Sequence, residues 1–249
     1  MGFQKESGEI GMAPNLEAFR QTRLANDSSE YIDQRDQLRL AEIELMRHQE
    51  KVAHMRRQLP QGAEIQDYAF EEGPADLNAG DSPVRIVRMG QLFTAADRAL
   101  IIYHFMFGKK NTKPCPMCTA WIDCMNGIAP HLAQNIDLAI VAAADPAKLR
   151  AHARARGWNK LRLLSAGTNS FKYDLGSEDR DGNQDSEVSV FVQDHGKVRH
   201  FYSSHPRMSP EIKERGLDLL NPIWNVLDLT PHGRGDFYAS LAYGTNVRW

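Results

Sequence analysis

Residues 113–124 read Lys-Pro-Cys-Pro-Met-Cys-Thr-Ala-Trp-Ile-Asp-Cys and hold all 3 cysteines of the chain. They follow its longest nearly unbroken apolar run, residues 99–107, which is typical of a strand buried on both faces of a sheet. After Pro116, apolar residues recur at helical spacing along one stripe: Met117, Ala120, Trp121, Cys124, Met125 and Ile128. The sequence therefore predicts a strand, a turn, a Cys-x-x-Cys pair and a helix, in that order.

Cys115 is placed by this pattern at the start of the helix. A cysteine there faces unpaired backbone N–H groups and the positive end of the helix dipole, and both favour thiolate over thiol. Pro116 suits the first helical position, where an N–H needs no partner. Cys118 returns to the same face, close enough to form a disulfide with Cys115 and release a bound substrate. This order of elements is that of a thioredoxin-type redox site.

Three lysines, Lys109, Lys110 and Lys113, lie in the loop before the cysteines. We expect their charge to lower the pKa of Cys115 further, although an ordinary solvated loop explains the same lysines equally well.

Other readings of the cysteines stay open. Structural zinc needs a second Cys or His pair, and Cys124, His131 and His104 offer none at a tight spacing. Inert core cysteines are common, but packing alone does not explain a Cys-Pro-x-Cys segment that opens a helix. Cys124 lies on the apolar stripe and is predicted to be a core residue, not a third redox partner. We predict neither a metal nor a cofactor.

Composition bounds the class of protein. The chain has 249 residues, 42% hydrophobic and 25% charged, as expected for one domain with an extension or two small domains. Its 30 Lys and Arg against 32 Asp and Glu give a net charge of -2, which indicates neither a nucleic-acid nor a membrane partner. Residues 1–14 lack a signal-peptide core, and no apolar run is long enough to span a bilayer. With its cysteine usage, this predicts a cytoplasmic protein.

The N-terminal part is predicted to be helical. Residues 1–13 are rich in Gly and polar residues and are expected to be disordered, whereas residues 14–60 form a helical extension. Its main helix starts at Ser28, an N-cap, and runs to Leu59 before Pro60 and Gly62 stop it. Only half of a coiled-coil seam is apolar. We therefore expect the helix to lie along its own domain or a second subunit, as in a homodimer.

Residues 61–234 alternate strands and helices. Strand-like segments at 65–70 and 84–87 suit a hairpin, and strands at 135–141 and 161–164 flank a helix from Pro146 to Gly157. This alternation predicts parallel strands with right-handed crossovers.

The second half of this domain is predicted to be a hairpin and a helix. The hairpin pairs residues 188–192 with 198–203, and the helix runs from 210 to 226 with Leu220 and Trp224 as core contacts. Residues 167–186 form a polar loop long enough for a lid. The fold class is therefore α/β, a thioredoxin-like mixed sheet flanked by helices, with a tail at residues 235–249.

A family resemblance rests on ordered motifs: Tyr103–Phe107, Cys115–Cys118, Asp123, Arg156–Trp158, His200–Ser203 and Leu227–Arg234. In this combination the chain resembles the bacterial thioredoxin-like family catalogued as domain of unknown function 899. The helix ending at Pro60 is similar to the N-terminal extension of that family. The resemblance implies a thioredoxin-like fold with a helical arm, and it implies a fold more than a substrate.

The sequence differs from two known kinds of active site, and both differences bear on its activity. A thioredoxin-type enzyme places a cis-proline before the hairpin to dock an extended substrate, but Ser186-Glu187-Val188 stand there, which speaks against protein-disulfide exchange. A peroxiredoxin-like site has a threonine three residues before its reactive cysteine, and Thr112 meets that spacing to Cys115. Gly108, however, stands where that motif has proline.

Further polar residues are candidates with plainer alternatives. His104 is a possible base, although a core histidine fits its apolar strand better. Asp123 either relays protons to Cys118 or makes surface contacts, and the second is favoured. The resemblance implies that Tyr202 and Ser203 hydrogen-bond the site. Arg162 and Arg199 are candidates for holding an anion, although a surface role is favoured for each.

Two functions from different classes follow. The first is a thiol oxidoreductase acting on a dithiol or peroxide substrate, in which Cys115 attacks and Cys118 resolves the intermediate. The second is a redox-sensing or metal-holding binding protein without turnover, which uses the helical arm for partners. A third possibility is that the cysteines are vestigial and the lid loop shapes a small-molecule pocket.

Overall fold

The structure is a computed structural model that describes residues 22–211 and 215–243. The chain divides into two compact units, residues 1–59 and 60–249. The predicted disordered segment, residues 1–13, lies outside the described residues, as does the start of the predicted helical extension at 14–21.

The first unit contains one long helix, α1 (Ser29–Arg57). The Ser28 hydroxyl accepts a hydrogen bond from the Tyr31 N–H at 3.1 Å and so caps the first turn, as the sequence predicts. Basic residues in the last turn complement the negative end of the helix dipole. No residue of α1 is buried, and several apolar side chains are exposed: Tyr31, Leu38, Leu45, Met46 and Met55.

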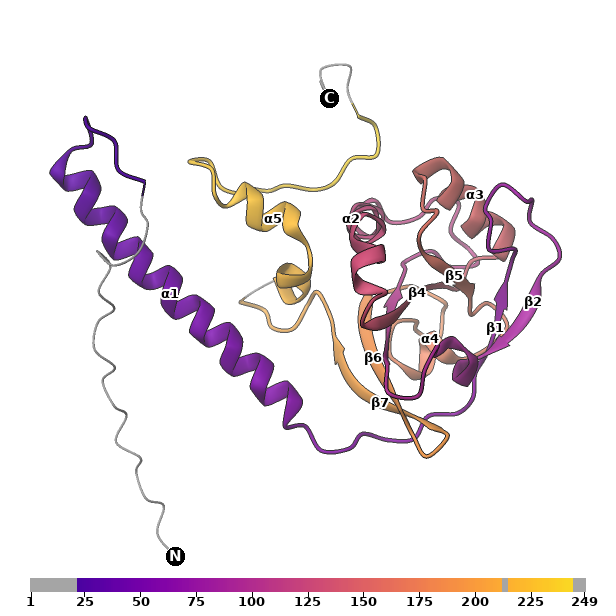
Figure 1. The fold of residues 1–249 in the computed structure, drawn as a ribbon. Coiled ribbons are helices and arrows are strands. Elements are labelled where there is room, and N and C mark those ends of the chain that lie inside the picture. The colour runs from indigo at the N-terminus through magenta and orange to yellow at the C-terminus, as the bar shows by residue number, and fades with distance from the viewer. Residues whose placement is uncertain (1–21, 212–214, 244–249) are drawn as a thin grey trace, which may run out of the picture. The chain divides into compact units, whose positions relative to one another are not determined.

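The second unit is built on a mixed sheet (Figure 1). Its strands in the described residues are β1 (Ala69–Glu72), β2 (Arg85–Arg88), β3 (Ala99–His104), β4 (Ile136–Ala142), β5 (Arg162–Ser165), β6 (Glu187–Asp194) and β7 (Lys197–Ser204). They lie in the order β2-β1-β5-β4-β3-β6-β7. The neighbours β3, β4 and β5 are parallel, and every other pair is antiparallel.

The connections confirm the predicted thioredoxin-like topology. Helix α2 (Pro116–Leu132) joins β3 to β4, and α3 (Pro146–Arg156) joins β4 to β5. The β6–β7 hairpin returns antiparallel beside β3. Helix α3 begins and ends where the sequence predicts. The Ala147 N–H donates to the Asp145 carboxylate at 2.8 Å, which caps the first turn, and Gly157 ends the helix in a left-handed conformation with φ 69°.

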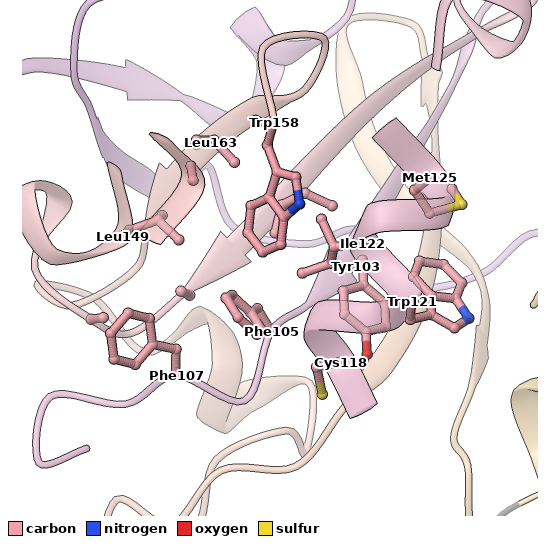
Figure 2. Packing of buried hydrophobic residues seen from close by; sticks show 14 of the residues in the cluster. Tyr103, Phe105, Phe107, Cys118, Trp121, Ile122, Met125, Leu149, Trp158 and Leu163 are labelled. Carbon is pink, nitrogen blue, oxygen red and sulfur yellow. The ribbon is translucent and has the colours of Figure 1, made fainter. Parts of the chain in front are cut away.

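Two hydrophobic clusters cover the two faces of the sheet. The first joins α2 and α3 to the sheet through residues such as Trp121, Ile122, Leu149 and Trp158 (Figure 2). The second contains Phe171 of the short helix α4 (Phe171–Asp174), together with Phe70 and Phe191. Side chains along a strand alternate between faces, so Tyr103 joins the first cluster, whereas Ile102 joins the second.

Helix α2 is rotated relative to its predicted apolar stripe. Its buried residues are Cys118, Thr119, Trp121, Ile122, Met125 and Ala129. Trp121 and Met125 belong to both sets, and the Trp121 ring stacks on Tyr103 at 4.2 Å between centroids. Ile128 is 46% exposed, and Cys124, predicted to be a core residue, is only half-buried.

The single helix predicted for residues 210–226 is wrong. The described residues there form a 3₁₀ helix, η3 (Arg215–Leu220), and a separate short helix, α5 (Pro222–Leu227). Pro222 forces the preceding Asn221 into an extended conformation. The Asn221 side-chain oxygen then accepts a hydrogen bond from the Ile223 N–H at 2.8 Å and so caps α5. Of the two predicted core contacts, Trp224 packs against the first cluster, but Leu220 is 47% exposed.

None of the helices in the described ranges combines the length and apolar character that crossing a membrane requires.

The register of α2 is testable with a matched pair of isoleucines. Ile122 is 0% exposed and Ile128 is 46% exposed on the same helix. We expect Ile122→Ala to lower the free energy of unfolding by about 2–5 kcal/mol, because it removes buried methyl groups and leaves a cavity. Ile128→Ala should change it by less than about 1 kcal/mol. Urea denaturation followed by circular dichroism measures both, and equal losses would contradict this register.

Candidate redox site

Cys115 stands immediately before α2, as the residue that caps the helix, with Pro116 in the first helical position. Its backbone has β-type angles, φ -64° and ψ 126°, and its carbonyl accepts from the Thr119 N–H at 3.0 Å. The Cys115 N–H donates to the Met106 carbonyl at 3.2 Å. The start of the helix is thereby attached to the segment that leaves β3.

The environment of Cys115 lowers the pKa of its thiol to about 6. The largest cause is a hydrogen bond from the Cys118 side chain, which partial burial of Cys115 opposes. The backbone N–H groups of Cys118 and Met117 and the side chain of Tyr238 lower it further. Cys115 is therefore mostly a thiolate at neutral pH.

The lysines expected to help Cys115 are all exposed. Lys110 donates instead to the Asp181 carbonyl at 2.7 Å. The hydrogen bonds at the start of α2 are thus the main source of the lowered pKa of Cys115.

Cys118 has the opposite character. It is 3% exposed, and its hydrogen bond to Cys115, its burial and the charge of Cys115 raise its pKa well above the ordinary value. The Tyr103 side chain and the Met106 backbone oppose that rise. The pair therefore combines an accessible thiolate with a buried, protonated thiol.

Tyr103 is the buried neighbour of Cys118 that the sequence analysis missed. Its ring is 2% exposed and lies between β3 and α2, with the hydroxyl close to the Cys118 sulfur (Figure 2). Burial raises the pKa of Tyr103 well above the usual value, so the phenol stays protonated and donates a hydrogen bond. It also contacts Ser186, which stands where a thioredoxin-type enzyme has its docking proline. The alternation of β3 would have placed Tyr103 on the helix side.

Cavities reach Cys115 from two sides. One, of about 130 Å³, is lined by Tyr103, Met106, Cys115, Met117, Cys118, Trp121, Asp185, Ser186, Pro206, Arg207, Leu217, Trp224 and Tyr238. Another, of about 440 Å³, is more polar and includes Lys110, Asn111, Lys113, Asn183 and Gln184. The Cys115 sulfur is thus approachable by a small reactant from an aromatic side and from a polar side.

His104 points to the other face of the sheet. Its Nδ1 lies 2.7 Å from the Ser177 hydroxyl, and its ring stacks on Phe171 at 5.0 Å between centroids. Burial, with the charge of Lys172 second, holds the pKa of His104 well below the ordinary value, so the ring stays neutral. The structure does not bring His104 to the cysteines.

The remaining predicted site residues line neither of the two cavities at Cys115. Thr112 is exposed and lines none of the cavities described here. The Asp123 carboxylate accepts from Arg156 and from the Trp158 indole N–H at 2.7 Å, which attaches α2 to the end of α3. The Ser203 hydroxyl lies 2.8 Å from that of Ser189, in a hydrogen-bonded group on the His104 side of the sheet.

Tyr202 and the two candidate arginines are likewise outside the cavities. Tyr202 is half-buried on β7 and lines neither of the cavities at Cys115. Arg162 donates to Glu72 at 2.8 Å, and Arg199 donates to Asp194 at 3.1 Å. Arg207 is the arginine that lines the 130 Å³ cavity, and no local sequence signal marks it.

A buried lysine, which the sequence analysis also missed, lies behind the site. Lys172 is 1% exposed, with Nζ 3.4 Å from the Phe105 carbonyl oxygen. Burial lowers its pKa to about 8, while its ionisable neighbours, the carboxylates of Glu178, Glu187 and Asp185 among them, act in the other direction.

The described residues contain no group of three or more His, Cys, Asp or Glu side chains arranged to hold a metal ion. Of the two histidines considered for zinc, His104 lies on the opposite face of the sheet from Cys118.

The contribution of Cys118 to the pKa of Cys115 is testable by substitution. In Cys118→Ala the pKa of Cys115 should rise from about 6 toward the ordinary value, because the largest stabilising hydrogen bond is lost. In Cys118→Ser, where a hydroxyl can still donate, it should stay below that of the alanine variant. The pH dependence of iodoacetamide labelling of Cys115, followed by mass spectrometry, measures both values. The same pKa in the two variants would contradict this account.

The solved structures to which the chain is similar include peroxiredoxins. The mitochondrial 2-Cys peroxiredoxin of Plasmodium falciparum has a TM-score of 0.46 and 10% identity, covering 68% of this chain and 95% of that one. The reduced 2-Cys peroxiredoxin of Plasmodium vivax has 0.44 and 16%, covering 64% and 93%. The reduced Prx3 of Vibrio vulnificus, crystallised with H2O2, has 0.43 and 16%, covering 62% and 90%. Similarities this distant carry no argument about activity.

No curated protein matches the sequence. A family model does match it, over residues 20–249. This confirms the resemblance indicated by the ordered motifs, and the chain belongs to the family described as "Bacterial protein of unknown function (DUF899)".

Proposed function

We propose that this protein is a thiol oxidoreductase with a thiol peroxidase-like reaction, in which Cys115 attacks and Cys118 resolves. The observation that carries the proposal is the contrast within one Cys-x-x-Cys pair. Cys115 has a lowered pKa and lines two cavities, whereas Cys118 is buried and has a raised pKa. A nucleophile needs the first character, and a resolving thiol is protected from reagents by the second.

With a peroxide, the Cys115 thiolate attacks one peroxide oxygen. The O–O bond breaks, an S–O bond forms, and the leaving oxygen takes a proton from solvent. The Cys118 sulfur then attacks the sulfenic sulfur of Cys115, and hydroxide leaves with the Cys118 proton as water. An external dithiol reduces the resulting disulfide and is itself oxidised. The Tyr103 hydroxyl, which contacts Cys118, orients that sulfur for the second step.

A peroxide is favoured over a protein disulfide. Ser186 and Glu187, at the start of β6, stand where a thioredoxin-type enzyme has the proline that docks an extended substrate.

Two further predictions stay with the proposal. A cytoplasmic location follows from the cysteine usage. A homodimer through α1 is supported by the exposed apolar residues of that helix.

The roles of the two cysteines are separable by trapping. In Cys115→Ser, turnover of peroxide with dithiothreitol should be lost, because no nucleophile remains. In Cys118→Ser, one turnover should leave Cys115 as a sulfenic acid that dimedone labels, and mass spectrometry locates the adduct. Cys124→Ser is the control and should behave as the parent protein, because burial raises the pKa of Cys124. Oxidised parent protein should carry a Cys115–Cys118 disulfide.

The outcome that favours the non-catalytic alternative is equally specific. Stoichiometric zinc bound by thiolates in reduced protein, with no reaction of Cys115 toward peroxide, would replace the oxidoreductase by a metal-holding protein.

A further inference from the structure

The cavity at Cys115 adjoins a much larger one. The second cavity has a volume of about 950 Å³ and shares four lining residues with the 130 Å³ cavity: Met117, Arg207, Trp224 and Tyr238. We refer to the two together as the Trp224 groove. One end of the groove is at the Cys115 sulfur, and the other lies between η3, α5 and residues 234–238.

The C-terminal segment forms one side of this groove. The Ala239 N–H lies 3.0 Å from the Met117 sulfur, in the first turn of α2, and Ala239 is buried. Arg234 binds Asp228 and also Asp218 at 2.7 Å, so it holds this segment to η3. The segment, drawn in yellow in Figure 1, thus lines a cavity that adjoins a cysteine distant in the sequence.

The contact surface of the groove is apolar and aromatic. Its side chains include Met117, Met208, Trp224, Phe237 and Tyr238, and the end near the sulfur adds Leu217. Such thioether and aromatic groups bind organic ligands through apolar contact.

Among the described residues, the charged side chains that line the larger cavity have both signs: Arg207, Arg215 and Arg234, and Glu211, Asp218 and Asp236. Two of the arginines donate to the same Asp218 carboxylate, each at 2.7 Å. Arg207 donates to Asp185, which lines the smaller cavity, at 2.6 Å. Because these arginines are paired with carboxylates, the groove offers little net attraction to an ionic substrate and selects by shape and apolar contact.

We propose that the Trp224 groove binds the organic part of a bulky, uncharged organic hydroperoxide and places its –OOH group against Cys115. This inference rests on the proposed oxidoreductase function. Hydrogen peroxide has no group that fills such a space, whereas volumes of about 300–1,000 Å³ are typical of sites for organic molecules.

The reaction in the groove is balanced. The Cys115 thiolate attacks the terminal oxygen of R–O–OH, the O–O bond breaks, and Cys115 becomes a sulfenic acid. The RO⁻ group takes a proton from solvent and remains as the alcohol ROH until it leaves. Attack by Cys118 then releases water and forms the disulfide, which an external dithiol reduces.

Comparing two peroxides tests the inference. With the full chain and dithiothreitol as the dithiol, kcat/KM for cumene hydroperoxide should exceed that for H2O2 by about tenfold or more, the effect of roughly one good aromatic contact. Phe237→Ala should reduce this preference about tenfold, because it removes an aromatic wall of the groove. The control is Leu229→Ala, a residue of the same C-terminal region that is 82% exposed and should leave both rates unchanged.

A binding measurement makes the test independent of turnover. In Cys115→Ser protein, 2-phenyl-2-propanol, the alcohol product of cumene hydroperoxide, should bind saturably and change the tryptophan fluorescence. Adding Phe237→Ala should weaken this binding, and adding Leu229→Ala should not. Equal rates for the two peroxides with no alcohol binding would overturn the groove inference and leave the oxidoreductase standing. Reaction of Cys115 with neither peroxide would overturn both.

Discussion

The hydrogen bond from the Cys118 thiol to the Cys115 sulfur depends on how α2 lies on the sheet. The burial of Cys118, Ile122 and Ala129 marks the face of the helix that lies on the sheet, and the bond from the Cys115 N–H to the Met106 carbonyl attaches the start of the helix to the segment after β3. A helix turned by one residue, about 100°, would move Cys118 out of the core and away from Cys115. The acidity of one thiol is therefore a product of packing along the whole helix.

Much of the fold was predictable because its signals are local. Pro116 and Asp145 mark helix starts, Gly157 marks a helix end, and the apolar runs at β3 and β4 mark buried strands. The rotation of α2 was not predictable in the same way. Apolar residues lie on two adjacent stripes of that helix, which share Trp121 and Met125, and only the tertiary structure shows that the stripe with Cys118, Ile122 and Ala129 is the buried one. The C-terminal helix was mispredicted because the break at Pro222 was given too little weight.

The candidate site was predictable only in part. The spacing and position of Cys115 and Cys118 pointed to them directly, and strand alternation was sufficient to place His104 on the opposite face from Tyr103. The groove was not accessible to such reasoning, because Trp224 and Tyr238 come from segments far along the chain that no periodic pattern links to the cysteines. Long-range contacts of this kind appear only once the C-terminal segment is seen against Met117.

In the proposed oxidoreductase, the position of Cys115 at the start of α2 would also set the direction of electron flow. The contacts that favour its anion act only while the sulfur is reduced, since a disulfide carries no charge for the helix dipole or the Cys118 thiol to stabilise. Each of them therefore raises the reduction potential of the pair. In the proposed reaction, the disulfide should therefore accept electrons from a dithiol more readily than a pair without these contacts would.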